Sequence, residues 1–250
     1  MLMLAPVSVP KAADVLSGIL REKILSGHLS EGVPLPNERE LGSQAGLSRA
    51  SVREALRILE SEGLISTSIG RNGGSEVVRP SSATIERSVV SFIRGRRIRM
   101  ESVLETRAVI EPPAARLAAL RHTDADFEKI EKCQVKLEDA SLAEDIPAYV
   151  RANLDWHVEL VRASHNELLI AFISAISQSV YAATDLDGFN LLEVRNAVTR
   201  AHRSVMDAIQ ARDGEAAARR MGRHVTSYIN SVQDTPHMNN QLNGIQPKES

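Results

Sequence analysis

The sequence is short of cysteine and of aromatic side chains. Cys133 is the only cysteine among 250 residues, which excludes a disulfide bond within the chain and indicates a reducing compartment. Aromatic residues make up 3%, and Trp156 is the only tryptophan, so stacking on unpaired nucleic-acid bases is not expected. Any contact with DNA should therefore come from a helix placed in a groove.

Long apolar segments and an excess of one charge are also missing. No stretch approaches the roughly 20 apolar residues that a membrane-spanning helix needs. The opening MLMLAPVSVP lacks the basic start and clear cleavage site of a signal peptide, so we expect a cytoplasmic protein with no membrane association. The formal net charge of −2 neither favours nor excludes DNA, because only the clustering of charge matters.

The first third of the chain has the pattern of three helices followed by a hairpin. The helices are expected at residues 11–26, 37–46 and 48–62. Val15, Ile19 and Ile24 are among the apolar positions of the first. Two β-prone runs, 64–69 and 76–78, follow the third helix and flank a glycine-rich turn.

The third predicted helix has an apolar face and a basic face. Its apolar stripe has the spacing i, i+3, i+4, i+7 and consists of Val52, Ala55, Leu56 and Leu59. Arg49, Arg53 and Arg57 repeat every four residues and line one exposed face. Arg49 stands near the N-terminus, where a recognition helix touches base edges, and an arginine there can pair with guanine. The alternative is an ordinary solvated face.

Two further features favour DNA contact. Ser48 and Ser51, at the N-terminus of the third helix, could bind phosphates. The hairpin tip carries Gly70 and Arg71, and a narrow backbone with a cation suits a wing that reaches into a minor groove. A plain flexible turn is the alternative interpretation of the tip.

Pro80 and the two serines after it mark a change of character. We expect a DNA-binding domain at 10–79, an all-helical domain at 82–233 and a disordered tail at 234–250. Helices of the second domain are predicted near 83–95, 100–120, 123–139, 144–164, 167–184, 189–211 and 214–233. Pro112 and Pro113 should kink the second of these.

Four polar residues of the second domain form a candidate metal site. Asn153 and His157 are four residues apart and so share one helix face, whereas His202 and His224 lie on the last two predicted helices. Three neutral imidazoles and one oxygen can hold a first-row divalent ion. The spacing alone is weak evidence, because single histidines are more often plain core or surface residues.

The segment LPNERELGSQAGLSRASVREALRILESEGLI, residues 35–65, resembles the DNA-binding domain of bacterial GntR-family regulators. The resemblance implies a mainly α fold, with an N-terminal winged helix-turn-helix whose wing is a small β-hairpin. It also implies DNA contacts from Arg39, Arg49, Arg53 and the wing at Gly70 and Arg71. Asn37 departs from the more frequent Ser or Ala but should cap the helix equally well.

Three segments, ETRAVIEPPAARLAAL, ANLDWHVELVRASHN and AHRSVMDAIQARDGEAAARRMGRH, resemble the FCD effector domain of the FadR subfamily, an all-α bundle. The resemblance implies that Asn153, His157, His202 and His224 are metal ligands. Zinc is the expected ion, with nickel or manganese as alternatives. Asparagine replaces the more common aspartate at the first position, which implies weaker metal binding.

The same resemblance implies an effector pocket for a small organic acid beside the metal. Arg107 matches the family arginine and is expected to pair with the acid's carboxylate. A surface ion pair between Arg107 and Glu111 is the alternative. Gln178 and Tyr181 are further candidates for the pocket lining.

Together these features predict a regulator that binds a near-palindromic double-stranded operator as a homodimer and responds to a small carboxylate. The resemblance implies a repressor as the more common form. Two alternatives stay open. One is a metal-independent regulator with an acyl-CoA pocket. The other is a metal-dependent enzyme, which would need Asp155 or Glu159 as its acid or base.

Overall fold

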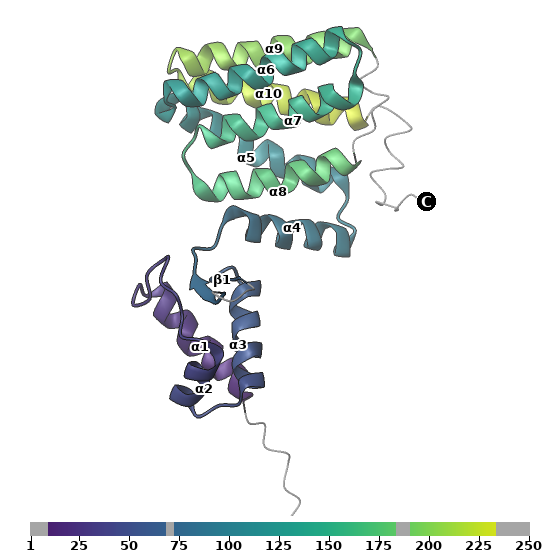
Figure 1. Ribbon diagram of the computed structural model, residues 1–250. Helices are drawn as coiled ribbons and strands as arrows, with labels where there is room; N and C mark the ends of the chain where they lie inside the picture. The colour runs from purple at the N-terminus through teal and green to yellow at the C-terminus, as the bar shows by residue number, and fades with distance from the viewer. Residues whose placement is uncertain (1–9, 69–72, 184–190, 234–250) are drawn as a thin grey trace, which may run out of the picture. The chain divides into compact units, whose positions relative to one another are not determined.

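The computed structural model describes residues 10–68, 73–183 and 191–233 (Figure 1). They form two compact units, one ending at Thr84 and one beginning at Ile85. This division lies inside the helix Ser82–Arg96, a few residues after Pro80. Both units are mainly helical, as the sequence predicts.

The first unit is a three-helix domain closed by a small hairpin. Its elements are α1 (Ala12–Leu25), α2 (Glu38–Ala45), α3 (Arg49–Ser61), β1 (Ile65–Thr67) and β2 (Ser75–Val77). The two strands are antiparallel, with Ile65 opposite Val77. The predicted apolar stripe of α3 is buried against α1, and Val52, Ala55 and Leu59 are 0% exposed. The expected winged helix-turn-helix is confirmed.

Only some of the apolar residues of α1 are buried. Val15 and Ile19 are 49% and 51% exposed, so they lie outside the core. Ala13, Leu16 and Leu20 are buried in their place. A helix has 3.6 residues per turn, so these three share a face that is rotated away from Val15 and Ile19.

Side-chain caps fix the turn between α2 and α3. Asn37 accepts a hydrogen bond from the backbone N–H of Glu40 and the Glu40 carboxylate accepts one from the N–H of Asn37, so both halves of a capping box are present. Gly46 ends α2 with a φ of 66°, a left-handed conformation that favours glycine. Ser48 then caps α3 by accepting from the backbone N–H of Ser51. The start of α3 is thus set by local chemistry.

The second unit is a bundle of long helices (Figure 1). They are α4 (Ser82–Arg96), α5 (Met100–Arg121), α6 (Asp124–Leu142), α7 (Ile146–Arg162), α8 (Glu167–Ala183), α9 (Leu192–Gln210) and α10 (Gly214–Gln233). Helix α5 is central, because it packs against α7, α8, α9 and α10. Pro112 and Pro113 lie inside α5, which continues unbroken to Arg121. Within the described residues, the helices are too short or too polar for a membrane span.

Replacing Ser48 by alanine should destabilise the start of α3. The side-chain acceptor for the Ser51 N–H is lost, and such caps contribute about 1 kcal/mol. Hydrogen exchange of the α3 amides in the full chain measures the change in opening free energy. Ser43→Ala, at an exposed position inside α2, is the matched control and should leave α3 unchanged. Equal protection of α3 in both variants would contradict the capping role.

Candidate functional site

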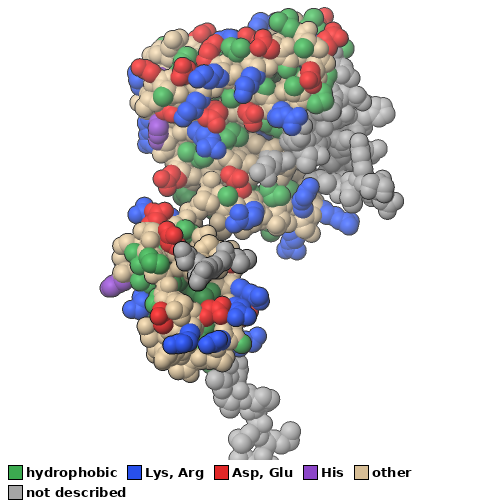
Figure 2. Space-filling model, in the orientation of Figure 1, with side chains coloured by type: hydrophobic (Ala, Val, Ile, Leu, Met, Phe, Trp, Pro, Cys, Tyr) green, Lys and Arg blue, Asp and Glu red, His purple; other side chains and the backbone are tan. Residues whose placement is uncertain are grey.

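The predicted DNA-contacting side chains of α2 and α3 lie on the surface of the first unit. Arg39, Ser48, Arg49 and Arg53 are exposed, and Ser51 is half-buried. Figure 2 shows Lys and Arg side chains gathered on this unit. The four exposed side chains lie outside the hydrophobic core, so each is accessible to a ligand such as DNA. Gly70 and Arg71 lie outside the described residues.

Arg53 is held in place by Glu38. Its Nε and Nη2 donate to the two carboxylate oxygens of Glu38 over 3.0 and 2.8 Å. The Arg53 hydrogen bond holds the pKa of Glu38 below its ordinary value, so the carboxylate stays ionised near neutrality. The pair joins the start of α2 to the outer face of α3. Because guanidinium has five N–H donors, Arg53 can still reach a phosphate.

Three histidines converge inside the second unit. His157 comes from α7, His202 from α9 and His224 from α10. The Nε2 atom of His224 lies 3.1 Å from that of His202 and 3.3 Å from that of His157. His157 and His202 are 1% and 0% exposed. The structure therefore brings together three residues that are 22 to 67 positions apart in the sequence.

These separations fit three ligands of a single metal ion. Two nitrogen ligands about 2.0–2.1 Å from one ion are about 2.8–3.4 Å apart, the lower end in octahedral and the upper end in tetrahedral geometry. Asn153 lines the same cavity, and its Oδ1 is a buried acceptor that has no hydrogen-bond partner among the described residues. A cation would satisfy this oxygen. The residues present thus fit a first-row divalent ion.

The histidines have the protonation state that metal binding needs. Burial lowers the pKa of His157 and His202, the latter strongly, and lowers that of His224 to about 3. The imidazoles are therefore neutral at neutral pH. Glu111 accepts a hydrogen bond of 2.6 Å from Nδ1 of His157, which leaves the Nε2 lone pair directed at the cluster.

Glu111 also pairs with Arg107, four residues earlier on α5. The Arg107 Nε donates to Glu111 over 2.5 Å, and the two residues are 3% and 0% exposed. The ion pair considered from the sequence exists, but it is buried. Burial alone would raise the pKa of Glu111, yet Arg107 and His157 hold it well below its usual range. The sequence analysis did not predict the contact between Glu111 and His157. The one indication was that Glu111 lies four residues after Arg107, on the same face of the helix.

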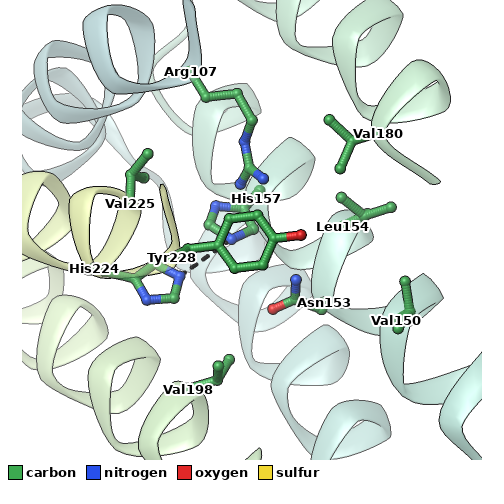
Figure 3. A pocket seen from close by; sticks show the side chains of 10 residues that line it. All are labelled: Arg107, Val150, Asn153, Leu154, His157, Val180, Val198, His224, Val225 and Tyr228. Atoms are coloured by element: carbon green, nitrogen blue, oxygen red, sulfur yellow. Dashed lines mark hydrogen bonds between the residues drawn. The ribbon is translucent and has the colours of Figure 1, made fainter. Parts of the chain in front are cut away.

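The cavity beside the histidines is nearly closed. Its volume is about 20 Å³, enough for a single ion or water but not for an organic acid. Figure 3 shows Arg107, Asn153, His157 and His224 around it. The remaining wall is mostly aliphatic and consists of Val150, Leu154, Val180, Val198 and Val225, with Tyr228. An acid can enter only if part of this wall moves.

Two groups of predicted residues stand apart from this cavity. Gln178 and Tyr181 belong to α8, but their side chains lie outside the described residues. Asp155 is exposed, and Glu159 pairs with Arg162, so neither carboxylate joins the histidines. Tyr228, one turn after His224 on α10, lines the cavity and was not predicted.

Comparison with known proteins matches both units. Residues 13–73 match the bacterial regulatory proteins of the gntR family, and residues 102–227 match the FCD domain. A putative L-lactate dehydrogenase operon regulatory protein of Escherichia coli K12 is 32% identical over 225 residues, covering 86% of this chain and 83% of the relative. The chain belongs to the GntR family of bacterial regulators.

Other relatives of this GntR regulator have opposite roles. The Glc operon transcriptional activator of E. coli K12 is 29% identical and covers 88% of this chain and 89% of its own length. The transcriptional repressor NanR of Cronobacter sakazakii is also 29% identical, with coverages of 89% and 85%. A solved GntR structure from Streptococcus agalactiae has a TM-score of 0.63 at 25% identity, covering 87% of this chain and 99% of that one. The chain is thus a DNA-binding transcriptional regulator with an FCD effector domain, and not an enzyme.

Replacing Glu111 by leucine should destabilise the second unit by about 3–5 kcal/mol, because it leaves the buried Arg107 charge without a partner. The free energy of unfolding is measured with urea and Trp156 fluorescence, since this only tryptophan is buried in the second unit. The double variant Arg107→Met/Glu111→Leu should recover most of the loss. Equal destabilisation of the single and double variants would contradict this account.

Proposed function

We propose that this regulator holds a divalent metal ion in its FCD domain, binds a small carboxylate beside it, and releases its operator in response. The observation that carries the proposal is the convergence of three neutral imidazoles on one point, with an unpartnered amide oxygen beside them.

The proposed metal ligands are Asn153, His157, His202 and His224. Zinc is the first choice, with nickel or manganese as alternatives, because nitrogen-rich sites accept all three. The amide of Asn153 is neutral, so it compensates less charge than a carboxylate would. When bound, the ion supplies a positive centre to which an effector carboxylate can coordinate.

The proposed effector is a small carboxylate that also pairs with Arg107. Glu111 occupies the Nε of Arg107, which leaves the other N–H donors of the guanidinium available for a second carboxylate. The aliphatic wall favours an acid with a short apolar chain. A relative named for an L-lactate dehydrogenase operon agrees with a small acid as the ligand. Gln178 and Tyr181 remain candidates for the lining.

On the DNA side, we propose that one α3 helix enters each major groove of a near-palindromic operator, in a homodimer. Arg49 is proposed to read base edges. Arg39, Ser48, Ser51 and Arg53 would contact the backbone near it, and the wing at Gly70 and Arg71 would reach the minor groove. If an effector binds one domain arrangement better than another, its binding changes the affinity for DNA. DNA binding then changes the affinity for the effector by the same factor. A repressor is the simplest form of this linkage.

The competing hypothesis is a metal-independent regulator that binds an acyl-CoA. Three histidine side chains that face each other, with His157 and His202 buried and His224 half-buried, are unexplained without a cation. Metal analysis of the purified full chain separates the two. Occupancy near zero would favour the acyl-CoA hypothesis.

Arg49→Ala should abolish sequence-specific DNA binding, because the variant lacks the side chain at the start of the recognition helix. The full chain is used to enrich duplexes from a random-sequence DNA pool. Wild type should enrich near-palindromic sites, whereas the variant should enrich none. Lys132→Ala, which removes one exposed positive charge from α6, is the control and should enrich the same sites as wild type. Enrichment of those sites by Arg49→Ala would refute the assignment.

His202→Ala should lose bound metal and the response to carboxylates while keeping DNA binding, since His202 lies only in the second unit. Metal content is measured on the purified protein, and thermal shifts are measured with a panel of small carboxylates. His28→Ala, at an exposed histidine of the first unit, should match wild type in both. Unchanged metal content in His202→Ala would rule out the site.

A further inference from the structure

His202 is connected to a group of polar residues on α6. Its Nδ1 lies 3.1 Å from the Oε1 of Gln134, which is 0% exposed. The Nε2 of Gln134 donates to Glu138 over 2.8 Å. Glu138 in turn accepts from Nε and Nη2 of Arg203 over 2.9 and 2.8 Å. The chain of hydrogen bonds therefore runs from a histidine of the metal cluster to a half-exposed ion pair.

Each link of this chain determines the orientation of the next. The Arg203 hydrogen bonds hold the pKa of Glu138 below its ordinary value, so Glu138 is an ionised carboxylate that can only accept. Gln134 must then turn its NH₂ group toward Glu138 and its carbonyl oxygen toward His202. His202 must donate from Nδ1 to that oxygen. A neutral imidazole has one N–H, so its lone pair is at Nε2, which faces the metal cluster.

The ring plane of His202 is fixed separately. Trp156 stacks on it with ring centroids 3.6 Å apart and an interplanar angle of 4°. Stacking of this kind holds the plane but does not choose which nitrogen carries the proton. That choice is left to Gln134. His157 differs, because the carboxylate of Glu111 contacts it directly without an intervening amide.

We infer that Gln134 and Glu138 are positioning residues that lock His202 in the tautomer able to bind metal, with Arg203 orienting Glu138. The inference rests on the proposed metal site and deepens it. If the amide of Gln134 were reversed, its NH₂ group would face Nδ1, the proton would move to Nε2, and His202 could not ligate. The half-exposed Arg203–Glu138 pair thus acts on the metal through the orientation of one buried amide.

The key variant is Glu138→Gln, because an amide at this position can donate as well as accept and lets Gln134 take either orientation. Glu131→Gln is the matched control. Glu131 also pairs with Arg203, over 2.5 Å, whereas the side-chain hydrogen bonds of Gln134 go to Glu138 and His202. Both variants remove one carboxylate from the same arginine.

Two measurements are made on the full chain. Zinc affinity is obtained by competition with a chromogenic chelator, and the His202 tautomer is obtained from imidazole ¹⁵N shifts of the metal-free protein. Glu138→Gln should weaken zinc binding about 10–100-fold, the usual effect of losing an outer-shell partner, and should show Nε2-protonated His202. Glu131→Gln should change affinity less than about twofold, since the outer-shell contact is intact.

A double variant tests whether the hydrogen-bond relay from Glu138 through Gln134 to His202 sets the tautomer of His202. In Gln134→Glu/Glu138→Gln, the carboxylate accepts from His202 and the new amide donates to that carboxylate, so the Nδ1-protonated tautomer and most of the zinc affinity should return. Equal zinc affinity and equal tautomers in Glu138→Gln and Glu131→Gln would overturn the relay while leaving the metal site intact. Absence of zinc binding in wild type would instead overturn the metal site, and the metal-free tautomers would still test the relay.

Discussion

The carboxylate of Glu111 is the group on which the second unit depends. It lies fully buried between the guanidinium of Arg107 and the imidazole of His157. A buried carboxylate without partners would be very unfavourable, so the ionised form persists only because both partners are present. The same two contacts orient a candidate metal ligand and hold a cation at the cavity wall. The stability of this region and the orientation of the candidate metal ligand therefore rely on one set of hydrogen bonds.

The small volume of the cavity bears on the proposed effector response. A volume of about 20 Å³ admits an ion but not an organic acid, so binding of an acid requires part of the wall to move. The wall is contributed by α5, α7, α8, α9 and α10. A ligand that requires some of these helices to separate binds only the opened arrangement and must shift the population toward it. An effector response of this kind is a change in the relative populations of the closed and opened arrangements.

In the first unit, short-range contacts set the geometry of the helix-turn-helix. Caps at Asn37 and Ser48 and the left-handed Gly46 set the two helices of the reading motif. The Glu38–Arg53 pair then holds one cation of the outer face in a defined position. These contacts join residues at most 15 positions apart, so the start and the outer face of α3 are fixed by nearby parts of the sequence.

Local chemistry explains which features could be read from the sequence. The helices, the capping box at Asn37 and the buried stripe of α3 follow from periodicity and short-range hydrogen bonds, and the histidine set followed from resemblance to a family. Apolar character alone does not say which face of a helix meets the core, and Val15 and Ile19 are exposed. Tyr228 was not predicted as a wall residue, because the residues that line a cavity depend on how the helices pack.

By itself, the sequence determined the helical segments, the caps and the basic face of α3, since each depends on residues a few positions apart. The histidines worth considering came from the resemblance to a family. Only the tertiary structure decided that Glu111 meets His157 across 46 residues and that Gln134 meets His202 across 68. Helix periodicity gives the face on which a side chain lies. It does not give the neighbouring helix or the register at which that helix packs, and those two quantities select hydrogen-bond partners inside a bundle.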